Sequence, residues 1–349
     1  MELTLYRDEA IFDILRAEWN ALLRRSQSDT IFLTWEWQAT WWHYLGALRG
    51  DLYVLAARRD GRLIGILPLY LTQDPGGKTL QVVGCIEVSD YLDLIVESGQ
   101  EQDVYAAFLT WLAGPEAPDW DLLDLCNQPA VSPAHVLLPE MARARGWLVD
   151  VLEEDVCPVI TLPVIPSEAG PDAGWEAYLA TLDKKQRHEI RRKLRRMDRE
   201  APGWRVRLVE GGSELLAAMD TFITLHRLSS PAKDTFMTEQ MQAFFRAMAQ
   251  VLAERGWLQL SFLEIAGQPV ASYLCFDYAN EILVYNSGYD PQASSQLSPG
   301  WVLLAEIIRY AIARGRARFD FLQGNEEYKY RFGGVDTQVY RTLIRRRQG

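Results

Sequence analysis

A pattern that occurs twice in the chain limits what it can fold into. Residues 52–71 read LYVLAARRDGRLIGILPLYL, with two apolar runs around Asp60-Gly61, and residues 258–276 repeat the pattern as LQLSFLEIAGQPVASYLCF around Gly267. Two apolar runs joined by a short turn predict a β-hairpin. Further along each half, a helix pattern precedes a strand that carries an aspartate, Asp124 in the first half and Asp320 in the second. The shared order predicts two copies of one α+β unit.

The boundary between the copies is predicted in residues 162–174, where Pro and Gly cluster. This boundary divides the chain into residues 1–165 and 166–349. Hydrophobic periodicity predicts helices at 8–25, 35–45, 101–113, 132–145, 175–200, 213–228, 239–254 and 300–314. The predicted strands are 52–59, 63–71, 79–85, 91–96, 120–125, a run to about 162, 257–265, 269–277, 282–288, 317–322 and 338–346.

Composition indicates an ordinary globular protein. The chain has 349 residues, 48% of them apolar, so two domains can each bury a core. The first ten residues carry charges and no apolar run, and WVLLAEIIRYAIA is interrupted by Glu306 and Arg309, so we expect neither a signal peptide nor membrane insertion. The four cysteines are far apart, and we expect buried thiols in a reducing, cytoplasmic setting rather than disulfides or a zinc site.

Two segments of the second copy are candidates for chemistry. In SSQLSPGWVLLAEIIRYA, Ser298 is a good N-cap, Pro299 suits the first helical position and Gly300 leaves the helix entrance open. Free amides at such an entrance bind anions, pyrophosphate above all, although a well-capped helix alone also explains the pattern. The second segment, FLQGNEEYKYRFGG, crowds charged and phenolic groups after a strand end, as proton transfer requires. A solvated turn is the alternative.

These two segments together resemble the acetyltransferase domain of the CelD-like, cellulose-biosynthesis-type family, a branch of the GNAT superfamily. FLTWEWQATWWHYLG, VSDYLDLIV and LHR at 225–227 agree with it, and the similarity extends over nearly the whole chain. This group is similar to tandem-GNAT proteins such as the FemABX transferases. The resemblance implies an α+β fold of two tandem GNAT-like units, each a mixed, mostly antiparallel sheet flanked by helices. The N-terminal unit would be degenerate and serve the acceptor, and the C-terminal unit would hold acyl-CoA.

The resemblance also implies roles for individual residues. The general base would be Glu326 or His226, and the general acid Tyr328 or Tyr285. An amide near Asn286 or Ser287 would polarise the thioester, and a loop would hold the diphosphate with Gln296, Ser298, Pro299 and Gly300. This loop departs from the common Gln/Arg-x-x-Gly-x-Gly/Ala pattern, because only Gly300 remains. Lys329 and Arg331 would hold an acidic substrate or CoA phosphates. The acceptor would meet Asp90, Tyr91 and Asp93.

Structural explanations compete with several of these roles. A lone histidine such as His226 is commonly a satisfied structural residue, and residues 90–93 also fit a strand with exposed acids. Tryptophans 35, 37, 41 and 42 have near-helical spacing, which favours core packing over stacking on a glycan.

Positive charge is concentrated in one helix, although the chain carries a net charge of −11. Nine Lys and Arg lie between Lys184 and Arg199. A solvated face, a surface that steers an anionic donor or acceptor, and a tRNA platform all fit this helix. RNA ranks third, because the helix is narrow and has no aromatic residues interleaved with its charges.

The sequence therefore predicts an N-acyltransferase that moves an acetyl or other acyl group from acetyl-CoA or another acyl-CoA to an amine, such as an amino sugar or a polysaccharide or envelope precursor. No metal is expected. The alternatives are an aminoacyl-tRNA-dependent transferase on the same fold and a non-catalytic GNAT-like binding module in polysaccharide biosynthesis.

Overall fold

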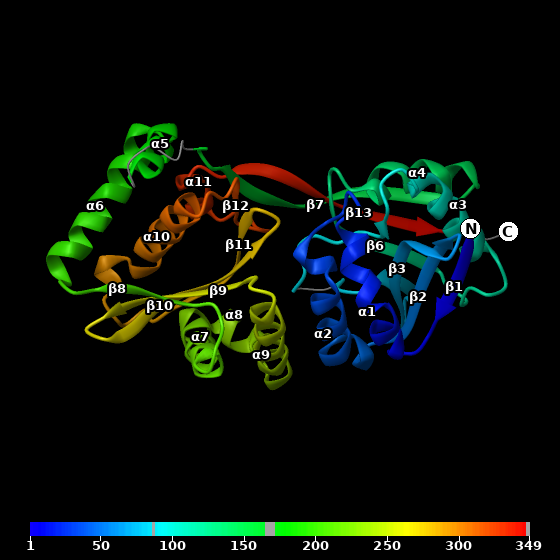
Figure 1. Cartoon of the computed structure of the whole chain (residues 1–349), viewed down its shortest axis with the longest axis horizontal. Helices are drawn as coiled ribbons and strands as arrows, with labels where there is room; N and C mark the ends of the chain where they lie inside the picture. Colours follow the sequence, from blue (N-terminus) through cyan, green and yellow to red (C-terminus); the bar gives the residue numbers. More distant parts are fainter. Residues whose placement is uncertain (86–87, 165–171, 347–349) are drawn as a thin grey trace. The chain divides into compact units, whose positions relative to one another are not determined.

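The computed structural model describes residues 1–85, 88–164 and 172–346, and the chain packs into two compact units. Unit 1 comprises Met1–Val156 and Thr337–Gly349, and unit 2 comprises Cys157–Asp336 (Figure 1). The C-terminal segment therefore packs with unit 1. The predicted boundary at 165/166 lies outside the described residues and stays a prediction.

Unit 1 is built on a mixed sheet. Strands β1 (Glu2–Tyr6), β2 (Asp51–Arg59), β3 (Arg62–Asp74) and β4 (Gly77–Val82) pair antiparallel in that order, and β5 (Ile95–Val96) pairs with β3. Strand β6 (Leu122–Pro129) joins β4 in parallel, and β13 (Val335–Arg345) pairs antiparallel with β6. Figure 1 shows α1 (Ala10–Leu23) and α2 (Trp35–Tyr44) on one side of the sheet and α3 (Glu101–Ala113) and α4 (Pro133–Ala144) on the other.

Unit 2 repeats this arrangement. Strands β8 (Arg205–Val209), β9 (Leu258–Ile265), β10 (Gln268–Tyr278) and β11 (Glu281–Tyr289) pair antiparallel in that order. Strand β12 (Arg318–Asp320) joins β11 in parallel, and the end of β7 (Leu148–Thr161) pairs antiparallel with β12. The helices are α5 (Ala173–Thr181), α6 (Lys184–Glu200), α7 (Leu215–Ser229), α8 (Pro231–Phe236), α9 (Glu239–Glu254), α10 (Pro299–Ala313) and α11 (Glu327–Arg331).

The two hairpins that suggested a duplication have the same turn. Asp60 and Gly61 both have positive φ, at 53° and 78°, and so do Ala266 and Gly267, at 50° and 78°. Two central residues with positive φ match the twist of the flanking strands. In both units the parallel pairing also ends at an aspartate, with Gln81 opposite Asp124 in unit 1 and Leu283 opposite Asp320 in unit 2. The predicted α+β class, a mixed sheet with flanking helices in each unit, is confirmed.

The buried residues explain why the helices pack where they do. In unit 2, α5, α6 and α10 cover one face of the sheet (Figure 1), and Ile190 and Met197 of α6 have no exposed surface. In unit 1, Trp37 and Trp41 are likewise fully buried and Trp42 is 5% exposed, so core packing is confirmed for these three rings. None of the described helices is both long and apolar enough to cross a membrane.

Where the sequence predicts one helix over 175–200, the structure has two. Leu182 has an extended backbone, and the Asp183 side chain accepts a hydrogen bond from the Gln186 amide at 2.9 Å. This N-cap starts α6 as a separate helix, because it satisfies an amide that otherwise lacks a partner.

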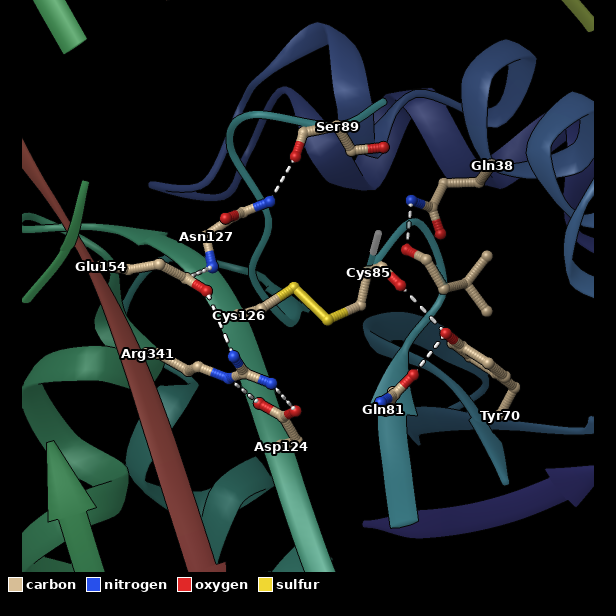
Figure 2. Close-up of a disulfide and its surroundings, with 11 residues drawn as sticks. Gln38, Tyr70, Gln81, Cys85, Ser89, Asp124, Cys126, Asn127, Glu154 and Arg341 are labelled. Atoms are coloured by element: carbon tan, nitrogen blue, oxygen red, sulfur yellow. Dashed lines mark hydrogen bonds and ion pairs between the residues drawn. A yellow bond between two sulfur atoms is a disulfide. The ribbon is translucent and has the colours of Figure 1, made fainter. Parts of the chain in front are cut away.

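The interpretation of all four cysteines as thiols is wrong for two of them. Cys85 and Cys126 form a disulfide, whereas Cys157 and Cys275 are free and buried. Cys85 follows β4 and Cys126 lies in β6, so the parallel pairing of these strands brings together cysteines that are 41 residues apart. Figure 2 shows the disulfide together with Tyr70 and with the ion pairs of Arg341. Tyr70 donates to the Cys85 carbonyl at 3.0 Å, and Arg341 lies between Asp124 and Glu154.

We predict that reduction of this disulfide destabilises unit 1. Opening a loop of about 40 residues restores chain entropy to the unfolded state, which corresponds to about 4 kcal/mol. Urea unfolding with and without dithiothreitol measures the difference. A Cys126→Ser variant is the control, because its unfolding should not respond to the reductant; equal stability of oxidised and reduced wild-type protein would contradict the prediction.

Candidate functional site

The candidate site lies in unit 2, where β11 and β12 separate. They pair only over Glu281–Leu283 and Arg318–Asp320, and β11 then continues to Tyr289 with β10 as its partner. A bulge opposite Leu274 and Cys275 adds one residue to β11 at Tyr285. Beyond Leu283, the edge of β11 on the β12 side has no partner strand in the described part of the chain. We call residues 284–289 the open edge.

Two side chains from neighbouring helices reach the open edge. The Lys233 ammonium of α8 donates to the Ser287 carbonyl at 2.5 Å, and the Tyr289 amide donates to the Ser229 hydroxyl of α7 at 3.0 Å. Alternate residues of a strand direct their backbone groups to the same edge. Helix α7 comes close here because residue 288 is glycine, since a Cβ at this position would lie 2.4 Å from the His226 nitrogen.

His226 belongs to this site and is buried, with 1% of its surface exposed. Its Nε2 lies 3.1 Å from Oδ1 of Asn286, and because a carbonyl oxygen only accepts, Nε2 carries the proton. Nδ1 has no hydrogen-bond partner among the described residues. Burial, together with the charge of Lys233, lowers the pKa of His226 to about 4, against the effect of the Asn286 bond. The ring is therefore neutral near pH 7 and keeps a lone pair on Nδ1.

The loop after β12 is held by Lys329. Its ammonium donates to the carbonyls of residues 322, 323 and 324 at 2.6–3.1 Å and pairs with Glu326 at 2.9 Å. Leu322 has a positive φ of 57°, which costs energy for a residue with a branched side chain. Lys329 is 2% exposed and its donors are used, so it supports the loop and is not placed to hold a substrate as predicted. Glu326 remains more than half exposed.

The two predicted acids differ in their surroundings. Tyr285 packs between Phe245 and Phe276, at 5.7 and 4.9 Å between ring centroids. Burial, followed by the charge of Glu326, raises the pKa of Tyr328, so this phenol keeps its proton at neutral pH. Arg331 pairs with Glu327 at the surface. The structure thus brings His226 to Asn286, next to Ser287, while Glu326 acts at longer range on the charge of Lys233. Tyr285 belongs to an aromatic cluster.

The entrance of α10 is less open to an anion than predicted. Ser298 occupies the N-cap position, but it has a left-handed backbone and its hydroxyl makes no cap. Its carbonyl accepts from the Trp301 and Val302 amides, while the amides of Leu297 and Ser298 bond to preceding carbonyls. The Gly300 amide has no acceptor among the described residues, and a Cβ there would meet nothing within 4 Å. Of the helical amides, Gly300 is thus the one best placed for a phosphate.

Helix α6 supplies positive charge next to this entrance. The Lys193 ammonium lies 4.1 Å from the centroid of the Trp301 ring, and burial lowers the pKa of Lys193. Four of the eight other basic residues of α6 are paired at the surface: Arg191 with Glu176, Arg192 with Glu189, and Arg196 and Arg199 with Glu200. Lys193 itself lies 3.7 Å from Glu189. Exposed pairs of this kind contribute little energy, and they reduce the net field of the helix.

The predicted acceptor residues lie in unit 1. Asp93 is 2% exposed and accepts from the Ser28 hydroxyl and the Leu94 amide. Burial raises its pKa to about 6, against the effect of these hydrogen bonds. Asp93 therefore holds the interior of unit 1 together and is not accessible to an acceptor as predicted. Asp90 and Tyr91 are half-buried, and the Tyr91 carbonyl accepts from Thr30.

The open edge has no counterpart among the residues of unit 1 that the structure describes. Its equivalent strands, β4 and β6, also separate after the last paired residues, Gln81 and Asp124. There a disulfide joins Cys85, four residues after Gln81, to Cys126, two residues after Asp124 (Figure 2). At the matching positions unit 2 has Ser287 and Leu322. The place that is open in unit 2 is thus covalently closed in unit 1.

Comparison with known proteins assigns the fold of this site. Residues 184–330 match the family model described as acetyltransferase (GNAT) domain. Unit 2 carries a GNAT fold. The finer resemblance to the CelD-like branch stays a prediction. None of the curated proteins compared with the chain matches it.

Solved structures of low sequence identity share the fold of the whole chain. A crystal structure of FemX is 11% identical with a TM-score of 0.66, covering 98% of this chain and 97% of that one. The structure of L-PGS from Bacillus licheniformis is 11% identical with a TM-score of 0.56, covering 95% and 92%. A tandem GNAT protein from the clavulanic acid biosynthesis pathway is 13% identical with a TM-score of 0.51, covering all of both chains. The chain therefore has the fold of a tandem GNAT-type acyltransferase.

Lys233 is the site residue that the sequence did not predict. It lies in RLSSPAKDTF, where Ser230 caps α8 by accepting from the Lys233 amide. A Ser-Pro pair so soon after an apolar helix signals a new short helix that contains Lys233, but the contact of Lys233 with Ser287 is not visible in this local pattern.

We predict that His226 stays neutral down to about pH 4. The unfolded state takes up a proton near pH 6.5, so the stability due to this group is present above pH 6.5 and is lost as the pH falls toward 4, by on the order of 3 kcal/mol. NMR titration of the His226 ring, assigned with a His226→Gln variant, measures the pKa. A midpoint at or above 6.5 would contradict the described burial.

Proposed function

We propose that this protein is an acyl-CoA-dependent N-acyltransferase whose reaction takes place at the open edge of unit 2. One observation carries the proposal: β11 leaves β12 after three paired residues, His226 and Lys233 contact the stretch that has no partner strand, and the charge of Glu326 acts on Lys233. A strand edge without a partner can bind an extended ligand through backbone hydrogen bonds. The pantetheine arm of CoA is such a ligand, because it carries two amides.

The residues near the start of α10 suit the diphosphate of the CoA donor. The Gly300 amide and the positive charge of Lys193 would take the diphosphate, and the open space at Gly300 leaves room for it. Gln296, Ser298 and Pro299 shape this loop. The diphosphate would be held by fewer amides than a helix N-terminus with a free first turn offers, and we expect correspondingly modest donor affinity.

The chemistry needs a base and positioned dipoles. The Glu326 carboxylate is exposed and accepts the proton that the amine loses as it attacks the thioester carbonyl carbon. The C–N bond forms, the C–S bond breaks, and the departing thiolate takes a proton from Tyr328 or from solvent. His226, the other predicted base, is as buried as Lys329 and Asp93, so Glu326 is the better placed of the two. No group of three or more metal-binding side chains is present among the described residues, and none is required.

The negative charge of Glu326 indicates the chemical class of the acceptor. Glu326 suits an ammonium that must be deprotonated, and an amino sugar or another polysaccharide or envelope precursor provides such an amine. The donor and this class of acceptor are made in the cytoplasm, which supports a cytoplasmic location. The disulfide gives no such support, since disulfides are rare in that compartment.

A second candidate is transfer of an aminoacyl group from tRNA. The fold likeness to FemX and to L-PGS favours it, and α6 offers Lys184, Lys185, Arg187 and Arg195, none of which has an ion-pair partner among the described residues. The third candidate, a non-catalytic module in polysaccharide biosynthesis, would need no open edge.

We predict that the protein releases CoA thiol from acetyl-CoA in the presence of a suitable amine, and that Gly300→Asp weakens donor binding at least about tenfold. The new carboxylate would repel the diphosphate without steric strain, because the position is open. Thiol release with an amine panel and calorimetry with acetyl-CoA measure both effects.

The control is Leu48→Asp, which adds the same charge at a position of unit 1 that is 77% exposed. Equal donor affinity of the Gly300→Asp variant would refute the diphosphate assignment. Inactivity with every acyl-CoA, combined with transfer from aminoacyl-tRNA, would favour the second candidate.

A further inference from the structure

The Lys233 ammonium is unusual because it lies half-buried at the open edge without a close carboxylate. Its hydrogen bonds within the described part of the chain go to one residue, to the Ser287 carbonyl at 2.5 Å and the Ser287 hydroxyl at 3.4 Å. An ammonium has three donors, so one has no acceptor among the described residues. An unused donor on a desolvated charge is costly unless a ligand completes its bonding.

The nearby charged groups do not neutralise Lys233. Burial lowers the pKa of Lys233 against the more distant attraction of Glu326, whose own ion pair is with Lys329. His226 is neutral near pH 7, and the next acid on α8, Asp234, pairs with Arg227 at 2.6 Å. The ammonium therefore has no ion-pair partner among the described residues, and its positive charge lies at the open edge.

We propose that Lys233 is a catalytic residue of the acyl transfer, in which its ammonium stabilises the negative charge that develops on the acyl oxygen. This assignment rests on the proposed function and adds a residue to it. Ser287 holds the ammonium beside the open edge, where the thioester of a donor bound along β11 would lie. A fixed positive charge at that point is favoured over water, because it needs no reorganisation as the oxygen becomes negative.

The step balances with the groups already named. The amine lone pair attacks the carbonyl carbon, the C=O π pair moves to oxygen, and the oxyanion forms beside the Lys233 ammonium. The C=O bond then re-forms as the C–S pair leaves with sulfur. The amine proton passes to Glu326 and the thiolate takes a proton from Tyr328 or from solvent, which yields an amide and free CoA thiol. Lys233 gains and loses no proton.

The test compares Lys233→Met with the wild type at saturating amine. Methionine keeps the length and apolar contacts of the side chain but removes the charge. We expect kcat to fall about 100-fold while KM for acetyl-CoA changes less than about threefold, because the lost interaction belongs to the transition state. Thermal melting and acetyl-CoA calorimetry check that the variant is folded and binds donor. Lys78→Met, which removes a half-buried lysine of unit 1 that pairs with Asp119, is the matched control.

Chemical rescue provides a second measurement. The cysteine introduced by Lys233→Cys can be alkylated with 2-bromoethylamine to restore an ammonium of nearly the original length, while Cys157 and Cys275 are fully buried and protected in the folded protein. We expect alkylation to recover at least about tenfold in kcat. A structural role alone would not require the charge.

The outcomes separate the two hypotheses. If the wild type transfers acyl groups and Lys233→Met has the same kcat, or alkylation restores nothing, the role of Lys233 is refuted and the proposed function stands. If the wild type transfers no acyl group from any acyl-CoA, the proposed function fails and this role fails with it.

Discussion

The early separation of β11 from β12 is the feature on which the rest of the site depends. Three residues of parallel pairing hold the two strands together, and Tyr285, the bulged residue, then changes the direction of β11. Gly288 lets α7 approach β11 closely enough for His226 to meet Asn286. Lys329 holds the loop on the β12 side by its carbonyls. In an ordinary sheet, a neighbouring strand would bond the backbone groups of this edge. Here they are left to form hydrogen bonds with side chains and a ligand.

The two units show what this separation allows and what removes it. Both units share hairpins with positive-φ turns and a parallel pair that ends at an aspartate. In unit 1 the disulfide Cys85–Cys126 closes the separation, and Asp93 is buried in the interior. In unit 2 the same place is open and carries charge. The two units therefore share one scaffold and differ at the place where their parallel strands separate.

Local patterns predicted most of the fold and part of the site. The helix at 101–113 has the predicted bounds, and the hairpins at Gly61 and Gly267 form where expected, because periodicity and turn chemistry act over short distances. Strands β1 and β8 were missed because both are short, and Lys233 was missed because its role arises from contact with Ser287, 54 residues away. The disulfide was missed because it also joins residues that are far apart in the sequence. The prediction that Ser298 is a good N-cap was wrong for its hydroxyl. The backbone of Ser298 is left-handed, and its carbonyl alone accepts from the first helix amides.

The most direct test of the account is hydrogen–deuterium exchange with and without saturating acetyl-CoA, followed by mass spectrometry of peptides from both units. If the donor arm pairs with the open edge, the amides of residues 285–289 and of the loop at 322–326 become protected, while peptides around Cys85 and Cys126 do not change. Unchanged exchange at 285–289 under saturation, or protection confined to unit 1, would contradict the claim that the separation of β11 and β12 forms the donor site.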